Sequence, residues 1–160
     1  MQACSTDLLG PDDINLSSHM FSRGLFTTEC AKNHLAVGHV LWATGCHFHN
    51  SFISEAFVRT NAAFFHSLME NEDSSVHLAN ASAVKITQRV RTTLTVRGSD
   101  GKLAHIGTTF SIIPMPPGVD VILSLKDMVF AAPDTLVYMI RRAAKQVKLS
   151  RSTSKDQPAV

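Results

Sequence analysis

Six side chains that can bind metals or act as nucleophiles lie within one short stretch of the sequence. Zinc sites in proteins use cysteine and histidine, usually in pairs spaced as Cys-x2-Cys or His-x3-His. The spacings here are Cys-x3-His and Cys-His-x-His, which argues against a shared metal. We predict no metal centre and no cofactor, and keep a zinc-binding β domain as an alternative. The six residues are Cys30, His34, His39, Cys46, His47 and His49.

A second chemistry open to this stretch is nucleophilic attack by a thiol. Cys46 is followed by His47 and His49, and a neighbouring histidine can activate a cysteine. Adjacent residues of an extended segment point to opposite faces, which disfavours a pair of Cys46 with His47. A thiol peptidase therefore stays a minor alternative.

The stretch from Leu41 to Phe57 has the pattern of a strand that enters a tight loop and returns. The apolar run Val40–Trp42 leads into the small residues Ala43-Thr44-Gly45, and Ser51-Phe52-Ile53-Ser54 follows a polar segment. Aromatic and β-branched residues favour strands, and glycine favours the turn between them. We expect the three small residues in a loop held between two strands.

This pattern resembles the active-site loop of retropepsin-like aspartic proteases, especially those of gypsy-class LTR retrotransposons. In that family, two apolar residues precede Asp-Thr/Ser-Gly-Ala, and Ser-Phe-Ile-Ser follows. Thr44, Gly45 and residues 51–54 match this pattern. Ala43 stands at the position of the catalytic aspartate, Cys46 replaces the usual alanine, and a short insertion precedes Ser51.

Two later segments follow the order of the same family. Residues 76–84, Val-His-Leu-Ala-Asn-Ala-Ser-Ala-Val, resemble the flap, and residues 120–129 resemble the Val-Ile-Leu-Gly segment before the last helix. Ser124 replaces the usual glycine, and one additional residue precedes Asp127. The resemblance covers Phe21 to Ile140. It implies that substrate is bound by Cys46, Leu78, Ala79, Asn80, Ala81, Ser82 and Ile122.

The resemblance implies an aspartic endopeptidase that acts as a homodimer. The mechanism needs two carboxylates that share one proton, and this chain has one such loop. Thr44 would tie the two loops together, and Gly45 would let the backbone approach the catalytic groups. The expected substrate is a polyprotein or peptide of a retroelement or virus, cut in the cytoplasm or within a virus-like particle.

Ala43 has no carboxyl group, so the chain as written is expected to be catalytically dead. Either an aspartate was replaced by alanine to stop self-cleavage, or the chain is a naturally inactive relative. A different class of function is also open: a non-catalytic, retropepsin-derived module that dimerises or binds peptides.

The expected fold is mostly β, a retropepsin-like closed barrel with a flap hairpin and one or two short helices. Its domain should span residues 19–149, between a flexible arm at 1–18 and a disordered tail at 150–160. Apolar periodicity and turn signals predict strands at 21–28, 35–42, 76–78, 84–96, 103–113, 119–125 and 135–140, a helix at 54–69 with a break at Asn61, a loop at 71–75 and a basic helix at 141–149.

Composition limits the other classes of function. The chain has 160 residues, 44% of them hydrophobic, which suffices for the core of one domain. The formal net charge of +2 argues against a nucleic-acid partner. No apolar run approaches the ~18 residues of a membrane span, and we expect no signal peptide. Three cysteines form no disulfide framework, which fits a reducing compartment.

Overall fold

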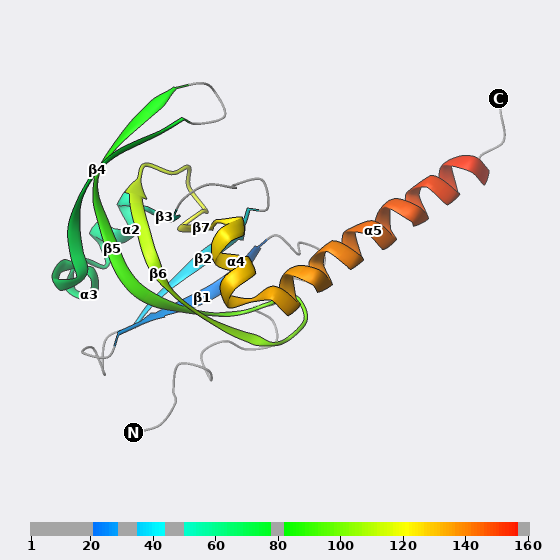
Figure 1. Ribbon diagram of the computed structural model, residues 1–160, viewed down its shortest axis with the longest axis horizontal. Helices are drawn as coiled ribbons and strands as arrows, with labels where there is room; N and C mark the ends of the chain where they lie inside the picture. Colours follow the sequence, from blue (N-terminus) through cyan, green and yellow to red (C-terminus); the bar gives the residue numbers. More distant parts are fainter. Residues whose placement is uncertain (1–20, 29–34, 44–49, 78–81, 157–160) are drawn as a thin grey trace.

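The computed structural model describes residues 21–28, 35–43, 50–77 and 82–156 of the chain (Figure 1). The N-terminal arm expected at 1–18 lies outside these residues. In chain order the elements are β1 (Phe21–Thr27), β2 (Ala36–Trp42), β3 (Ser51–Ser54), α2 (Glu55–Thr60), α3 (Ala62–Phe65), the 3-10 helix η2 (His66–Leu68), β4 (Met69–His77), β5 (Ala83–Arg97), β6 (Leu103–Ile113), β7 (Val121–Leu123), α4 (Leu125–Ala131) and α5 (Pro133–Asp156).

Six strands close into a barrel in the order β1-β2-β7-β3-β6-β5. The ring closes because β1 pairs with β5 as well as with β2, and β4 extends the sheet on the far side of β5. The pairs β2–β7 and β3–β6 are parallel, and the other neighbours are antiparallel. The prediction of a mostly β, closed barrel is therefore confirmed, as are the paired strands β1 and β2.

An aromatic cluster fills the barrel interior. The ring centroid of Phe26 lies 5.5 Å from that of Phe65 and 5.7 Å from that of Phe110, both in edge-to-face geometry. All three side chains are fully buried. Edge-to-face pairs add to the free energy gained by burying the rings. Trp42 at the end of β2 is also buried, and its indole Nε1 donates a hydrogen bond of 2.8 Å to Ser22 Oγ.

The helical segment after β3 breaks at Asn61, as the sequence predicted. The Ser54 hydroxyl accepts a hydrogen bond from the Phe57 amide at 3.3 Å and caps the start of α2. At the other end, the backbone and side-chain amides of Asn61 both donate to the Phe57 carbonyl, at 3.1 Å and 2.9 Å. This double contact ends α2, and α3 starts at Ala62.

The prediction of a loop at 71–75 is wrong, because these residues belong to β4. The polar composition predicted a loop, but the segment pairs with β5, with a register shift between Asn71 and Ser74. Backbone amides and carbonyls are satisfied by a partner strand whatever side chains they carry. Pairing with β5 therefore makes these residues a strand despite their polar composition.

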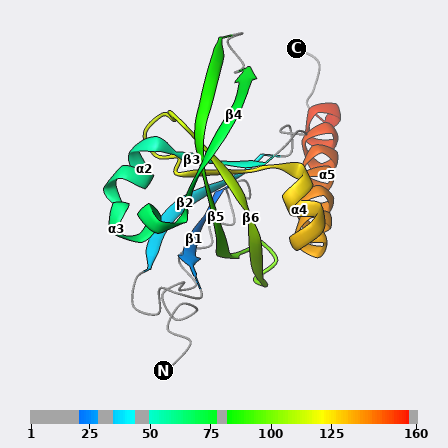
Figure 2. The same cartoon turned by 60° about the vertical axis from the view of Figure 1, so that its left-hand side comes forward.

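The prediction of a strand at 135–140 is also wrong, because these residues lie in α5. Leu136 and Met139 are buried at helical spacing, and Thr135 Oγ1 donates to the Asp100 carboxylate at 3.0 Å. The helix then runs away from the barrel to Asp156 (Figures 1 and 2). It is longer than the short helices expected, and it makes residues 150–156 helical where a disordered tail was expected.

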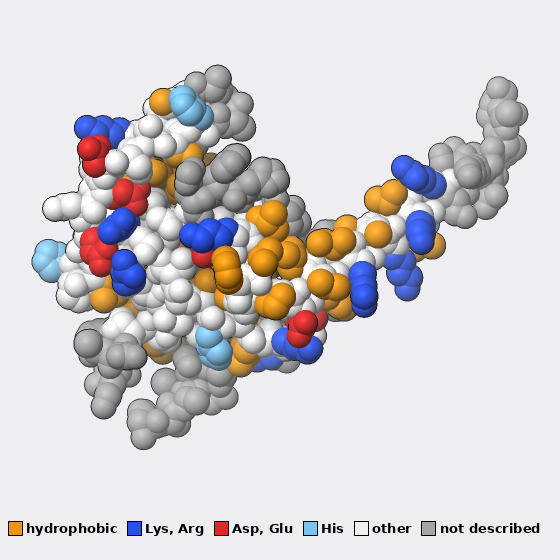
Figure 3. Space-filling model, viewed as in Figure 1, with side chains coloured by type: hydrophobic (Ala, Val, Ile, Leu, Met, Phe, Trp, Pro, Cys, Tyr) orange, Lys and Arg blue, Asp and Glu red, His pale blue; other side chains and the backbone are white. Residues whose placement is uncertain are grey.

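Exposed apolar side chains gather on α4 and α5, as the space-filling view shows (Figure 3). Phe130 is 81% exposed and Ile140 is 56% exposed, and Val129 and Val137 are exposed as well. We call these four residues the apolar patch. None of the helices in the described part of the chain is long and apolar enough to cross a membrane.

Gly24→Ala should destabilise the barrel by about 1–3 kcal/mol. A Cβ atom at Gly24 would lie 2.6 Å from Leu94 Cδ1 and 3.1 Å from Val40 Cγ2, and both neighbours are fully buried. The matched control is Gly107→Ala, where the nearest atom, Thr93 Oγ1, would lie at 3.4 Å. Urea unfolding should show a change below about 0.5 kcal/mol for the control. Equal stability of the two variants would contradict this account of the β1–β5 closure.

Candidate active site and substrate cleft

The residue after β2 is held at the end of a parallel strand pair. Trp42 lies opposite Leu123 in the β2–β7 register. The Ala43 amide then donates a hydrogen bond of 3.1 Å to the Leu123 carbonyl. Ala43 is therefore positioned by its backbone, and its side chain takes no part in that contact. The predicted site residues Thr44, Gly45 and Cys46 lie outside the described residues.

One buried carboxylate fixes the strands on either side of this position. Asp127 Oδ2 accepts hydrogen bonds from Ser51 Oγ at 2.5 Å, from the Ser51 amide at 3.2 Å and from Ser124 Oγ at 3.2 Å. Thr108 Oγ1 donates to Asp127 Oδ1 at 3.0 Å. The Ser124 amide donates in turn to Ser51 Oγ at 3.0 Å. These bonds link the start of β3, the middle of β6 and the junction between β7 and α4.

The charge of Asp127 is stabilised by hydroxyl and amide donors. Asp127 is only 7% exposed, and a buried ionised carboxylate is costly unless its oxygens accept hydrogen bonds. Sequence reasoning placed Asp127 at a helix start but missed this role. The available signal was Ser124 three residues earlier, whose hydroxyl accepts from the Asp127 amide at 3.3 Å and caps α4.

The predicted flap segment follows β4 at the end of a long hairpin. β4 and β5 pair from Met69 opposite Val90 to His77 opposite Ala83. The hairpin extends away from the barrel body (Figures 1 and 2). Leu78, Ala79, Asn80 and Ala81 lie outside the described residues, and Ser82 directly precedes β5. The flap assignment of this tip stays a prediction.

A small apolar cluster, separate from the barrel core, connects the outer half of the β4–β5 hairpin with β3, β6 and β7. Its buried members are Phe52 of β3, Ile86 of β5 and Ile113 of β6. The predicted site residue Ile122 packs against this cluster, so the fold brings it together with the hairpin. The other partly buried members are Val76, Val84 and Met115.

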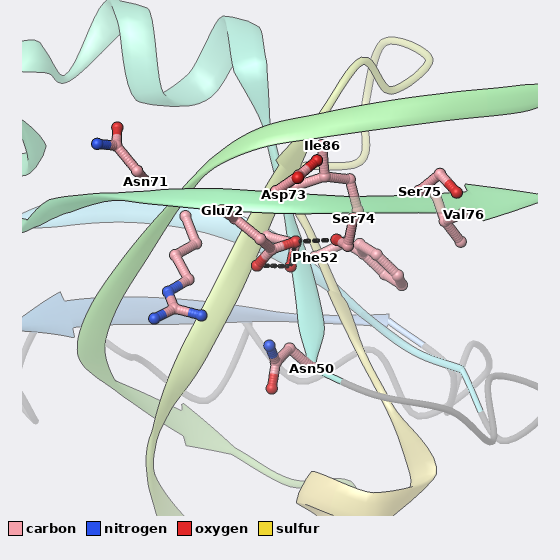
Figure 4. A pocket seen from close by; sticks show the side chains of 11 residues that line it. Asn50, Phe52, Asn71, Glu72, Asp73, Ser74, Ser75, Val76 and Ile86 are labelled. Atoms are coloured by element: carbon pink, nitrogen blue, oxygen red, sulfur yellow. Dashed lines mark hydrogen bonds between the residues drawn. The ribbon is translucent and has the colours of Figure 1, made fainter.

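A cavity of about 420 Å³ opens beside this cluster (Figure 4). It lies between β4 on one side and the start of β3 on the other, and Asn50 at its edge directly precedes β3. We call it the hairpin cavity. Its lining residues are Asn50, Phe52, Asn71, Glu72, Asp73, Ser74, Ser75, Val76, Ile86, Arg89 and Ser111.

Arginines of β5 hold a carboxylate of β4 at the root of the hairpin. Glu70 lies 3.0 Å from Arg89 Nε and 3.4 Å from Arg91 Nε. The hydrogen bond from Arg89 lowers the pKa of Glu70; desolvation opposes this shift, and the charge of Arg91 adds to it. A lowered folded-state pKa means that the pairing stabilises the fold above the unfolded pKa. That contribution is lost as the pH falls through the lowered value.

Most of the Cys/His stretch, namely Cys30, His34, Cys46, His47 and His49, lies outside the described residues. His39 lies in β2, and its amide donates to Asp120 Oδ2 at 2.8 Å. The described residues contain no group of three or more potential metal ligands. The absence of a metal from this stretch stays a prediction.

Comparisons with protein-family models, curated proteins and solved structures find no significant match to this chain. Any function assigned to it therefore depends on the geometry described above and on the resemblance of the loop, flap and β7 segments.

Asp127→Ala should destabilise the protein by about 3 kcal/mol or more, because it leaves three hydroxyls and an amide without their acceptor. Asp134→Ala is the control: that carboxylate is 83% exposed and lies 3.8 Å from Lys102 Nζ, so its loss should cost less than about 1 kcal/mol. Chemical unfolding of both variants measures the difference. A small effect of Asp127→Ala would show that other contacts hold β3, β6 and β7 together.

Arg89→Gln should raise the pKa of Glu70 towards the ordinary glutamate range. Arg91→Gln should raise it less, because the hydrogen bond from Arg89 is the larger cause of the shift. Both values can be followed by NMR titration of the Glu70 side-chain carbonyl carbon. A larger effect of Arg91→Gln would reverse the roles assigned to the two arginines.

Proposed function

We propose that this protein is a retropepsin-like aspartic endopeptidase domain that cuts a polyprotein or peptide as a homodimer. In this proposal the chain with Ala43 is a catalytically dead form of the enzyme. An aspartate at position 43 would supply one carboxylate of the shared pair, and the same position of a second copy would supply the other.

The observation that carries the proposal is the backbone bond from Ala43 to Leu123. It holds position 43 at the end of the paired strands β2 and β7. β7 also pairs with β3, where Phe52 lies opposite Ile122. Phe52 and Ile122 belong to the apolar cluster beneath the hairpin. Position 43 is thus held by β7, the strand that also carries Ile122 of the cluster beside the hairpin cavity.

The chemistry of the reaction accounts for the need for two copies. One ionised carboxylate takes a proton from water, and a neutral one protonates the carbonyl oxygen of the scissile peptide bond. Two carboxyl groups held close together share one proton, since two like charges at short range cannot both ionise. Aspartic proteases in general use such a dyad, and it serves here as the model for a dimer of this chain.

The apolar patch supports the homodimer part of the proposal. Soluble monomers rarely leave large contiguous apolar surfaces in water, and Phe130 is 81% exposed. α4 starts directly after Ser124, which is hydrogen-bonded to Ser51 at the head of β3. We propose that a second copy of this chain covers Val129 and Phe130, because this surface continues from the strands that hold position 43.

A non-catalytic module that dimerises or binds peptides is the second candidate. Ala43 itself favours it, because an alanine side chain can neither accept nor donate a proton. The two candidates share the same fold and cleft. They differ in whether a carboxylate at position 43 produces hydrolysis.

Ala43→Asp should create or restore peptidase activity that is highest at acidic to mildly acidic pH. The two aspartates of a dimer would titrate as a coupled pair with split apparent pKa values. Activity should therefore fall at high pH, where both groups are ionised. The assay is cleavage of the protein itself and of a peptide library between about pH 4 and 7, with the unaltered protein alongside.

Inhibitors and sedimentation separate the remaining alternatives. Pepstatin should block the Ala43→Asp protein, and alkylation of Cys46 should not. Sedimentation at micromolar concentration should show a dimer. If folded Ala43→Asp dimers cleave nothing, the non-catalytic module is the better assignment. If the unaltered protein cleaves and alkylation stops it, Cys46 is the nucleophile.

A further inference from the structure

The lining of the hairpin cavity combines apolar side chains with a carboxylate. Phe52, Ile86 and Val76 are the apolar members, and the first two are nearly fully buried. Glu72 contributes its carboxylate from β4. The close-up shows its carboxylate beside the hydroxyl of Ser74, to which a dashed line joins it (Figure 4). A ligand in this cavity would contact both apolar carbon atoms and a carboxylate.

The Glu72 carboxylate is held in place by hydroxyl groups. Ser111 Oγ of β6 lies 3.0 Å and 3.1 Å from its two oxygens, and Ser74 Oγ donates to Oε2 at 2.5 Å. These donors fix the direction of the carboxylate but leave its negative charge in place. A fixed, charged acceptor is well suited to bind a cation through charge-assisted hydrogen bonds.

Nearby cations within the described part of the chain do not neutralise Glu72. Arg89 also lines the cavity, but its Nε is hydrogen-bonded to Glu70 at 3.0 Å. Asp73, a neighbour on β4, adds a further negative charge to the lining. The cavity therefore carries more negative than positive charge, although the chain as a whole has a formal net charge of +2.

We infer that the hairpin cavity binds the side chain of a lysine or arginine in the peptide substrate; this inference rests on the proposed function. Lysine and arginine have an aliphatic stem that packs on apolar surface and a charged head that stays near polar groups. The stem lies along Phe52, Val76 and Ile86, and the head binds Glu72. The cavity thus selects substrates with a basic residue at one fixed position from the scissile bond.

Equilibrium peptide binding tests this inference on the protein as it stands, because a chain with Ala43 does not consume its ligand. The probes are fluorescein-labelled decapeptides with four apolar central residues. Each outer position carries in turn lysine, norleucine or glutamate. Norleucine keeps the aliphatic stem and lacks the charge. At one outer position, lysine should bind about five-fold more tightly than norleucine, and glutamate should bind more weakly than both.

Glu72→Gln should abolish the preference for lysine over norleucine, because glutamine keeps the hydrogen-bond acceptor and loses the charge. Glu55→Gln is the matched control, since Glu55 lies on α2, outside the cavity, and pairs with Arg59 at 2.8 Å. It should keep the full preference. If Glu72→Gln does not fold, the unaltered protein still provides a test: the preference should shrink as salt is raised from 0.05 M to about 1 M.

Three results would overturn the inference: no binding of any probe, equal binding of lysine and norleucine at every position, or a preference that persists in Glu72→Gln. These outcomes are separable from the test of the peptidase. An inactive Ala43→Asp protein with Glu72-dependent lysine selection would leave the cavity assignment standing and remove the peptidase. An active Ala43→Asp protein without lysine selection would support the peptidase and remove the cavity assignment.

Discussion

The buried carboxylate of Asp127 is the constraint on which the arrangement of the short strands depends. β3 has four residues and β7 has three, so the ladders alone offer few hydrogen bonds to fix their register. Asp127 adds bonds to Ser51 at the head of β3 and to Thr108 in β6. Hydroxyl donors are small enough to reach one carboxylate from three directions. A buried arginine or lysine in their place would need further acceptors of its own.

The hydrogen bonds of Asp127 hold the strands around position 43 without using the side chain of that residue. The contact that holds Ala43 is made by its backbone amide and the Leu123 carbonyl. Leu123 is fully buried and is followed directly by Ser124, which belongs to the Asp127 network. The strands that present position 43 are therefore held by groups that do not involve its side chain. An alanine and an aspartate there are therefore compatible with this backbone contact, and under the proposed function the residue at position 43 decides the reaction and leaves the contact unchanged.

Local sequence patterns predicted the elements whose partners lie nearby in the chain. The β5–β6 hairpin followed from alternating apolar residues around Gly98-Ser99-Asp100-Gly101, and the turn is closed by the Gly101 amide bonding to the Gly98 carbonyl at 2.9 Å, with φ of +80° at Gly101. The loop predicted at 71–75 is an exception, because its partner residues 85–88 of β5 are close in sequence, and there the polar composition concealed a strand. The error at 135–140 occurred where a distant contact contributes, since Thr135 bonds to Asp100 in the β5–β6 turn. The role of Asp127 was missed for the same reason, since its partners Ser51 and Thr108 are remote in sequence. The loop motif led us to propose position 43, which stays a prediction, and composition carried no sign that Glu72 would meet Ser111.

The described residues form two separate apolar clusters, and the smaller one lies beside the hairpin cavity. The large core around Phe26 and Phe110 holds the barrel, whereas the cluster of Phe52, Ile86 and Ile113 has only three buried members. Regions with few buried apolar contacts open at lower free energy than the core, so we expect the part of the hairpin beside this cluster to open at lower free energy than the barrel. The cavity beside this small cluster leaves apolar surface for a ligand to cover. The polar bonds from Ser111 to Glu72 then limit how far β4 can move from β6. In the proposed complex, a weakly packed hairpin tethered through Glu72 would admit a peptide and still present a fixed charge to it.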